Sequence, residues 1–380
     1  MCERLLRGEI VMDKLIILGT SEDQHPLIRK AKEMGYETHV CGWRLDLVKE
    51  RVGDVYHEVN ILNYEALWNE VKDLGAAGVA TCASELAMHS MNYLLRKMGI
   101  PCNSIESEEI ATNKYLMRKA MKAAGILSPH FELVNCDTDK AVFESFDYPV
   151  IIKPIDESSS RGVTKVNNIQ EVKDAIQFAL SWSKVDKVIM EDFIEGQEYS
   201  GESIAYMGDY KLLAVTEKTT TGAPHFVERG HKQPADLSNE LYDKVEETLY
   251  KAFKSIGIMY GAIHPEFRIT SDGKIYFMEI AARMGGDFIG SELTYLSSGY
   301  DFLRMMIDVG CGRRPVIERT GEQQKAEVRF ILNQADLEEM HRFEKNKEGT
   351  VLKYSKWKDL SDKPILQNPD RAGYYIIVEN

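Results

Sequence analysis

The sequence of 380 residues has no long apolar run and no cysteine pattern that would mark a specialised class. Its longest apolar runs, at residues 14–19 and 148–152, are strand-sized, whereas crossing a bilayer takes roughly 20 residues. Six cysteines are scattered without CxxC or CxH spacing, which predicts reduced thiols and a cytoplasmic location. With only 27 glycines and 11 prolines, the collagen-like and low-complexity classes are excluded.

Positive charge is also in short supply. The 47 lysines and arginines are outnumbered by 60 acidic residues, and the net charge is -13. Such a chain repels polyphosphate backbones and anionic lipid surfaces, so we expect neither nucleic acid nor membrane as a partner. Residues 1–12 lack an apolar core and a cleavage site; we expect an N-terminal extension, with Met12 as an alternative natural start.

The first part of the chain alternates strand-like and helix-like patterns. Apolar runs at residues 15–18, 38–40 and 78–80 are separated by amphipathic stretches, which is typical of βαβ units on a parallel sheet. We therefore predict an α/β, Rossmann-like domain over residues 13–110. Residues 19–21 could receive an anion at a helix start, but the GxGxxG pattern is absent, and a purely structural domain is the favoured interpretation.

The remaining patterns predict a linking helix and then α+β segments. A Ser-Asp-Gly turn at residues 271–273 predicts a hairpin between two strand-like runs, and residues 219–238 are expected to form a long polar loop. The predicted segments are a linking helix at 111–128, a subdomain at 129–198, a subdomain with an antiparallel sheet at 199–312 and a small closing α+β subdomain at 313–380.

A phosphate-binding pattern follows one of the apolar runs. Lys153 ends the run, and a short turn rich in serine follows it, with Ser159, Ser160, Arg161 and Gly162. Small residues let backbone N–H groups approach a phosphate while a lysine neutralises its charge. The alternative is a solvated lysine before an ordinary loop, and the spacing alone does not decide between them.

A second pattern suits the nucleoside part of a nucleotide. Glu191 ends a strand-like run, and Glu198 lies seven residues further on. Backbone groups leaving a strand can pair with an adenine edge, and a later carboxylate can hold both ribose hydroxyls. The alternative is an ordinary acidic turn, but together with Lys153 the nucleotide interpretation is favoured.

The most specific group of residues is an acidic pair on the predicted hairpin. Glu266 and Glu279 lie on its two arms, and Arg283 follows. Two carboxylates on adjacent strands repel each other unless a hard cation such as Mg²⁺ lies between them. Arg283 could then stabilise charge on a transferred phosphoryl group. Exposed edge-strand glutamates are the alternative, but the apolar residues around Glu279 make it the less favoured one.

Two further residues lie together in the long polar loop. Glu228 could receive an ammonium group, and His231 is three residues away. Neither His231 nor His264 has metal-ligand spacing to another His or Cys, so we do not expect a zinc site.

Several stretches taken together resemble ATP-grasp carboxylate–amine ligases, in order and spacing, from about residue 14 to residue 310. The domain at 13–110 is similar to the one that precedes ATP-grasp in biotin carboxylase and the purine-pathway ligases. The segment 226–231, with Arg283 and Gly286, resembles most closely the L-amino acid ligases that make dipeptides. The stretches that carry the resemblance are residues 113–114, 148–154, 160–163, 191–196 and 278–286.

The resemblance implies a role for each matching position. It implies that ATP is bound and that Lys114, Lys153 and the 159–162 turn contact its phosphates. It also implies that the backbone of Glu191 and Ile194 contacts the adenine, and that Glu198 contacts the ribose. It implies one or two Mg²⁺ ions, with Mn²⁺ as a substitute, on Glu266 and Glu279, and an acyl phosphate stabilised by Arg283. The substrate residues implied are Glu228, His231, Arg283, Gly286 and Asp287.

The resemblance also implies the reaction and the partners. The substrates would be a small carboxylate, an amino acid for preference, and an amine, joined with release of ADP and phosphate; a homodimer is common in the family. Two departures are visible: Ala281 stands where many members have a metal-binding Asn, and Asp287 where some dipeptide ligases have a bulky apolar residue. Carboxylation through carboxyphosphate and an ATP-binding regulator without turnover remain as alternatives.

Overall fold

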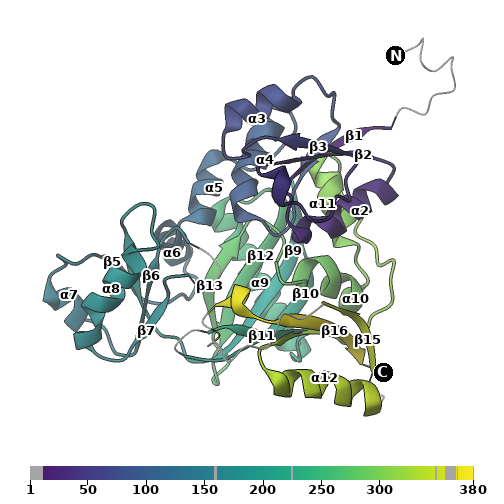
Figure 1. The fold of residues 1–380 in the computed structure, drawn as a ribbon. Coiled ribbons are helices and arrows are strands. Elements are labelled where there is room, and N and C mark those ends of the chain that lie inside the picture. Colours follow the sequence, from purple (N-terminus) through teal and green to yellow (C-terminus); the bar gives the residue numbers. More distant parts are fainter. Residues whose placement is uncertain are drawn as a thin grey trace, which may run out of the picture.

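The computed structural model describes residues 12–157, 161–223, 226–346, 349–355, 365 and 367–379. Its first layer is a four-stranded parallel sheet in the order β3-β2-β1-β4, at the top of Figure 1. The predicted parallel α/β domain is therefore confirmed. Its elements are β1 (Lys14–Leu18), η1 (Glu22–Gln24), α2 (His25–Glu33), β2 (Glu37–Gly42), η2 (Leu45–Leu47), β3 (Val55–Glu58), α3 (Tyr64–Val71), β4 (Gly78–Ala80), α4 (Glu85–Met98) and α5 (Ile105–Thr112).

A small antiparallel sheet forms a separate lobe, at the left of Figure 1. Helix α6 (Lys114–Ala123) leads into it, and its strand order is β5-β8-β6-β7. One face of the sheet packs on α8, with Val150, Ile152 and Ile176 in the apolar core. The elements of the lobe are β5 (Phe131–Val134), α7 (Lys140–Glu144), β6 (Val150–Pro154), β7 (Thr164–Val166), η3 (Ile169–Glu171), α8 (Val172–Leu180) and β8 (Val188–Asp192).

A large eight-stranded sheet forms the body of the molecule, in the order β13-β12-β9-β10-β11-β14-β16-β15. Its strands are β9 (Gln197–Tyr206), β10 (Asp209–Thr220), β11 (Glu228–Gln233), β12 (Tyr260–Ile269), β13 (Ile275–Ala281), β14 (Ala326–Ile331), β15 (Gly349–Tyr354) and β16 (Gly373–Glu379). The helices between them are α9 (Asn239–Ile256), η4 (Ile289–Leu293), α10 (Thr294–Ser298), α11 (Phe302–Gly310), α12 (Gln334–Asn346) and η5 (Asn368–Asp370).

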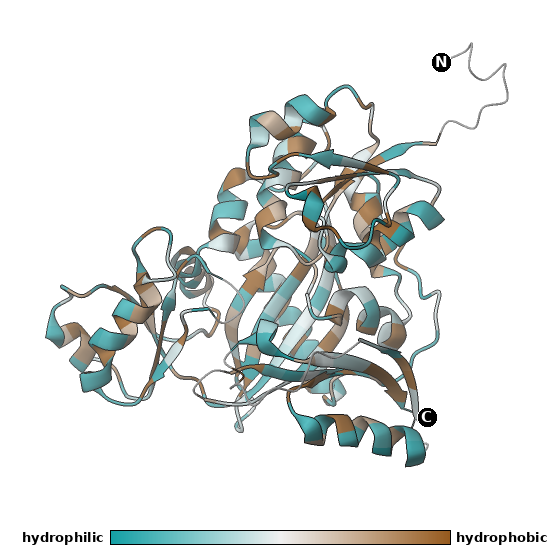
Figure 2. Ribbon diagram, in the orientation of Figure 1, coloured by the Kyte–Doolittle hydropathy of each residue, from teal (hydrophilic) through white to brown (hydrophobic). Residues whose placement is uncertain are grey.

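Local sequence signals explain how the helices of this body end and pack. Ser238 caps α9 by accepting the N–H of Leu241, and Gly257 ends the helix in the left-handed conformation that glycine tolerates best. The apolar face of α9, with Leu249 and Phe253, is buried in the main core. Figure 2 shows α12 as largely hydrophilic with interspersed hydrophobic residues, and the latter include the buried Leu337, Met340 and Phe343.

Two features of this body differ from the sequence prediction. The stretch 219–238 is not one loop, because β10 continues to Thr220 and β11 forms within it. The residues of β11 are charged or polar apart from one glycine, so they show no alternation of apolar and polar side chains. Strands from 313–380 do not form a sheet of their own, because β14 pairs with β11 and β16 with β14. The tail thereby supplies three adjacent strands at one end of the large sheet.

The parallel domain packs directly on the large-sheet body. A Cβ atom at Gly78 would collide with the backbone oxygen of Gly310, so the start of β4 approaches the end of α11 as closely as glycine permits. Among the described residues, no helix combines the length and apolar character needed to span a membrane.

Candidate active site

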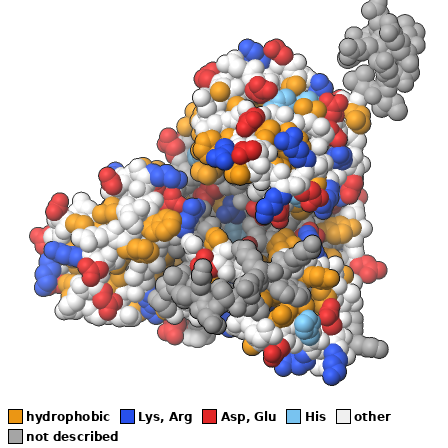
Figure 3. All heavy atoms as spheres, viewed as in Figure 1, with side chains coloured by type: hydrophobic (Ala, Val, Ile, Leu, Met, Phe, Trp, Pro, Cys, Tyr) orange, Lys and Arg blue, Asp and Glu red, His pale blue; other side chains and the backbone are white. Residues whose placement is uncertain are grey.

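A cavity lies where the small lobe, helix α6 and the large sheet meet. In Figure 3, lysine, arginine and acidic side chains gather around the hollow between the lobe and the body. The structure brings nine of the predicted site residues to the lining of this one cavity: Lys114, Lys153, Glu191, Ile194, Glu198, Glu228, Glu266, Glu279 and Arg283. The predicted Ser159 and Ser160 lie outside the described residues. Arg161 and Gly162 are described and lie beside the cavity rather than in its lining.

The cationic end of the cavity is built by α6 and β6. Asn113 caps α6 through its side chain, so Lys114 stands in the first turn. The Lys114 Nζ atom lies 2.9 Å from Glu279 Oε1 and donates to the Glu157 carbonyl at 2.7 Å. Burial opposes the charge of Lys114, but nearby carboxylates, Glu279 first, outweigh it and raise its pKa. Lys153 differs from Lys114 in the direction of its pKa shift. Burial and the nearby cations Arg118 and Lys114 lower the pKa of Lys153, although the carboxylate of Glu191 acts in the opposite direction.

Arg118 completes this end, although the sequence analysis did not single it out. Its side chain is fully buried, with Nε 2.7 Å from Glu191 Oε1, while Lys153 Nζ lies 2.6 Å from Glu191 Oε2. The sequence does contain a signal for Arg118, because it falls on the buried face of α6. The residues of that face are spaced three or four apart: Lys114, Met117, Arg118 and Met121. An arginine on a buried face requires an acidic partner.

Both carboxylate oxygens of Glu191 are therefore paired with cationic side chains inside the protein. Glu191 is 1% exposed. Burial raises its pKa, but the charges of Arg118 and Lys153 lower the pKa by more, so Glu191 stays ionised. Its predicted contact with adenine concerned the backbone and stays a prediction. The Ile194 carbonyl accepts a hydrogen bond from Arg268 at 2.8 Å, and Arg268 also lies 2.9 Å from Glu198 Oε2.

The acidic end of the cavity lies on β12 and β13. Glu266 and Glu279 are direct cross-strand partners, so their side chains emerge on the same face of the sheet. They are partly exposed, at 28% and 24%. Carboxylate oxygens on one face are the donors that Mg²⁺ prefers, so this pair fits a magnesium ion.

Lys218 on β10 is a second residue that the sequence analysis did not identify. Its buried Nζ lies 2.7 Å from Glu266, 3.0 Å from Glu228 and 3.3 Å from Glu198. Burial opposes its charge, yet these three carboxylates raise its pKa well above the ordinary lysine value. Conversely, Lys218 lowers the pKa of Glu266 against the effect of burial. Lys218 thus forms ion pairs with three glutamates.

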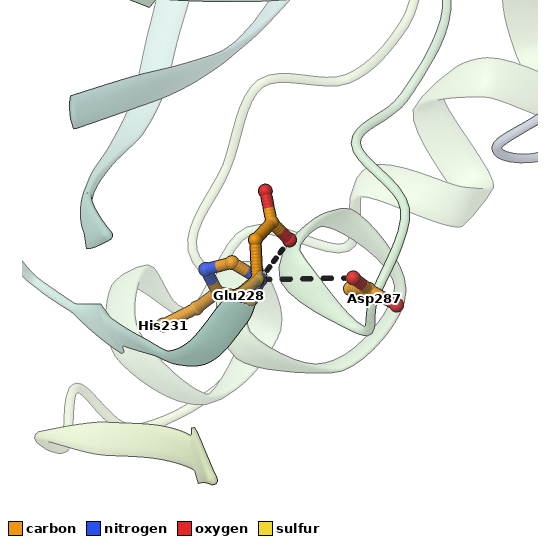
Figure 4. Close-up of side chains that lie close together, drawn as sticks. All are labelled: Glu228, His231 and Asp287. Atoms are coloured by element: carbon orange, nitrogen blue, oxygen red, sulfur yellow. Dashed lines mark ion pairs between the residues drawn. The ribbon is translucent and has the colours of Figure 1, made fainter. Parts of the chain in front are cut away.

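A further group adjoins this end and is shown in Figure 4. Glu228 and His231 lie on β11, with His231 Nε2 3.0 Å from Glu228 Oε2 and 3.9 Å from Asp287 Oδ2. The ligand atoms of these three residues lie close enough to hold a metal ion. However, Lys218 contacts Glu228, and Arg371 holds Asp287 by two hydrogen bonds of 2.7 and 2.9 Å. Both carboxylates of this group therefore also take part in ion pairs with cationic side chains.

Arg283, Gly286 and Asp287 lie where the first cavity adjoins a second one. Arg283 lines the first cavity and donates to the Met284 carbonyl at 2.9 Å. Gly286 and Asp287 line the second cavity, beside the first turn of the parallel domain, and Asn368 lines both cavities. His231 is completely buried and lines neither.

The chain is similar to known ligases in sequence and fold. Residues 146–292 match the family model of the ATP-grasp domain. The vancomycin/teicoplanin A-type resistance protein VanA of Enterococcus faecium is 29% identical over 247 residues, covering 60% of this chain and 67% of that protein. Alanine–anticapsin ligase of Bacillus subtilis is 26% identical over 265 residues, covering 64% of this chain and 56% of that protein. The chain thus spans between 56% and 67% of the length of these two curated relatives.

The same architecture is found in solved structures. The L-amino acid ligase of Bacillus licheniformis superposes with a TM-score of 0.79 at 20% identity, covering 97% of this chain and 94% of that chain. Phosphoribosylglycinamide synthetase of Anaerococcus prevotii gives a TM-score of 0.73 at 21% identity, with 97% and 94% covered. The predicted combination of a Rossmann-like domain with an ATP-grasp fold is confirmed. The match over residues 146–292 and the fold around it are those of the ATP-grasp superfamily.

Proposed function

We propose that this protein is an ATP-dependent carboxylate–amine ligase. It activates a carboxylate, an amino acid by preference, as an acyl phosphate and joins it to an amine, releasing ADP and phosphate. The observation that carries the proposal is a single cavity with the cations Lys114, Lys153 and Arg283 around the carboxylate pair of Glu266 and Glu279. The names of the ligase relatives, which include alanine–anticapsin ligase, support an amino acid as the acid.

In the first step, a carboxylate oxygen of the acid attacks the γ-phosphorus of ATP, and the bond to the β,γ-bridging oxygen breaks. Lys114 and Lys153, both nine-tenths buried, bring cationic charge to the phosphates in a water-poor environment. In phosphoryl transfer the protein contributes mainly by positioning the groups and stabilising charge. This chain has the cations to do so at one end of its cavity.

Glu266 and Glu279 are the residues that would hold magnesium. Bound there, Mg²⁺ would neutralise the charge of the triphosphate. Arg283, four residues beyond Glu279, offers a planar set of N–H donors. We assign it to the oxygens of the acyl phosphate, where negative charge accumulates.

In the second step, the amine attacks the acyl carbon, phosphate leaves with the electron pair of the broken C–O bond, and the nitrogen loses a proton. Glu228 lines the cavity, and we assign it to the ammonium group of an amino acid substrate. Burial raises its pKa, but Lys218 and then His231 lower it well below the ordinary value, so it remains an anion for that purpose. We expect Gly286 and Asp287, in the adjoining cavity, to contact the substrates.

The test is phosphate release from purified protein with Mg·ATP and amino acids, singly and in pairs. We expect Glu279→Gln and Arg283→Ala to abolish turnover while the thermal midpoint stays near that of the wild type. Glu247→Gln, on the exposed face of α9 with a side chain 68% exposed, is the matched control and should retain full activity. Near-normal release by either active-site variant contradicts the proposal, as does release that depends on bicarbonate and not on amino acids.

A further inference from the structure

Four side chains share one face of the hairpin formed by β12 and β13. His264 is the cross-strand partner of Ala281, and Glu266 is the partner of Glu279. Residues two apart on a strand point to the same side, and all four line the cavity that we assign to ATP. Ala281 contributes no polar atom, so the imidazole of His264 is the polar group at that corner of the face.

His264 is held from behind by a buried carboxylate. Its Nδ1 contacts Glu202 Oε1, and Glu202, which is completely buried, also accepts the N–H of Gly285 at 3.1 Å. The His264 side chain is 6% exposed. Its other nitrogen, Nε2, lies 3.5 Å from Glu266 Oε1, at the outer limit of a hydrogen bond. Glu202 thus orients the ring so that Nε2 faces the carboxylate pair.

We propose that His264 Nε2 is a third protein ligand, beside Glu266 and Glu279, of the divalent cation that serves the ligase reaction. The inference rests on the proposed function for the presence of that cation. A histidine that binds a metal commonly donates its other N–H to a carboxylate, which sets the tautomer and the ring orientation. Glu202 and His264 already form this pair, with the second nitrogen directed toward the oxygen ligands.

The charge balance leaves room for a cation at this position. Glu198, Glu228, Glu266 and Glu279 are paired with Lys218, Arg268 and Lys114, so four carboxylates face three lysine or arginine side chains. The rival arrangement is a protonated His264 that bridges Glu202 and Glu266 and never binds the ion. The two arrangements differ in whether a histidine nitrogen is bonded to the metal.

A nitrogen ligand has a measurable consequence for metal choice. Imidazole suits later first-row metals, whereas sites made only of oxygen favour magnesium. We therefore expect Co²⁺ to bind the nucleotide complex more tightly than Mg²⁺ by a larger factor in the wild type than in His264→Asn. Equal factors in the two proteins would count against the nitrogen ligand.

The direct test is pulsed electron paramagnetic resonance of Mn²⁺ bound to the full chain with ADP. In protein labelled with ¹⁵N-histidine, we expect a ¹⁵N coupling to Mn²⁺ in place of the ¹⁴N coupling seen in unlabelled protein. The nucleotide stays unlabelled, so its nitrogens do not change between the two samples. Because this comparison uses the unchanged sequence, it does not depend on how any variant folds.

Variants then assign the coupling to one residue. It should disappear in His264→Asn and persist in His231→Asn, and Mn²⁺ affinity should fall about 10–100-fold in Glu202→Ala, as for other losses of a carboxylate behind a ligand. Tightly bound Mn²⁺ without a label-dependent coupling, or with a coupling that survives in His264→Asn, overturns the inference and leaves the ligase proposal intact. Failure of Mn²⁺ and nucleotide to bind at all contradicts the ligase proposal as well.

Discussion

Arg118 Nε lies 2.7 Å from Glu191 Oε1, and the two side chains are 0% and 1% exposed. Because Glu191 also contacts Lys153, this pair connects helix α6 to strands β8 and β6 of the small lobe. A buried carboxylate with two cationic partners has little freedom to move. Arg118 is thus a positioning residue for the lysine that we assign to the nucleotide phosphates.

We expect Arg118→Met to destabilise the protein and weaken nucleotide binding together. Breaking a buried ion pair from one side costs about 3–5 kcal/mol, because the remaining charge stays buried. Thermal unfolding measures the loss, and ADP titration measures the affinity. The double variant Arg118→Met with Glu191→Gln should recover part of the stability, since the side chain that has lost one of its two cationic partners is then uncharged. A thermal midpoint equal to that of the wild type in Arg118→Met would contradict this role.

The second prediction concerns the pH dependence of nucleotide binding. Burial is the main cause of the lowered pKa of Lys153, with Arg118 and Lys114 contributing. As the pH rises through this lowered pKa, Lys153 loses its proton and its attraction for phosphate. ADP affinity should therefore fall at a lower pH than an ordinary lysine would require.

Calorimetry over an alkaline pH series checks this prediction, because ADP binding should also take up a proton in that range. Lys153→Arg is the control, since a guanidinium stays charged over the whole series. It should bind ADP with a flatter pH profile. Parallel profiles for the two proteins would show that Lys153 is not the titrating group.

The third prediction concerns Arg371, which the C-terminal tail brings to the substrate end of the site. It holds Asp287 by two hydrogen bonds, and its guanidinium lies 3.6 Å from the centre of the Phe330 ring. Lysine can reproduce neither the paired hydrogen bonds nor the planar stacking. We expect Arg371→Lys to raise KM for an amino acid substrate more than KM for ATP.

The stability cost of Arg371→Met should be about 1.5–3 kcal/mol, the range for hydrogen bonds to charged groups. Adding Asp287→Asn should reduce that cost, because the partner left behind is then uncharged. Equal increases of both KM values in Arg371→Lys would place Arg371 outside substrate recognition.

The fourth prediction tests the support of His264 through its neighbouring backbone. A Cβ atom at Gly285 would collide with Glu202 Oε1 and lie 2.7 Å from His264 Nδ1. Because Glu202 is completely buried, it has little room to yield. We expect Gly285→Ala to lower the thermal midpoint and to weaken Mn²⁺ binding at least 10-fold.

Gly286→Ala is the matched control for this change. A Cβ atom there has Ala83 Cβ at 3.9 Å as its nearest neighbour, which is ordinary contact. Thermal midpoint and Mn²⁺ affinity should stay near the wild-type values, whatever happens to substrate binding. If both glycine variants bind Mn²⁺ as the wild type does, the packing around Glu202 does not support the metal site.

Local patterns were sufficient for much of the secondary structure and for the acidic pair. The alternation over residues 13–110 correctly predicted a parallel sheet. The turn at 271–273 joins β12 and β13 as expected, and this hairpin places Glu266 opposite Glu279. Such features depend on residues close together in the chain, where periodicity and turn chemistry dominate. Within residues 219–238 the same rules did not predict strand β11, because this strand is stabilised by pairing with the distant β14.

The sequence by itself determined the strand and helix periodicity, the hairpin carrying two glutamates and the basic residues around them. Only the tertiary structure decided which charges meet: Arg118 with Glu191, Lys218 with three glutamates, and Arg371 with Asp287. The partners in these contacts are separated by at least ten residues, and most of them by tens of residues, so no local pattern links them. Their selection follows from burial, since a charge enclosed by packing is stable only beside an opposite charge that another segment supplies.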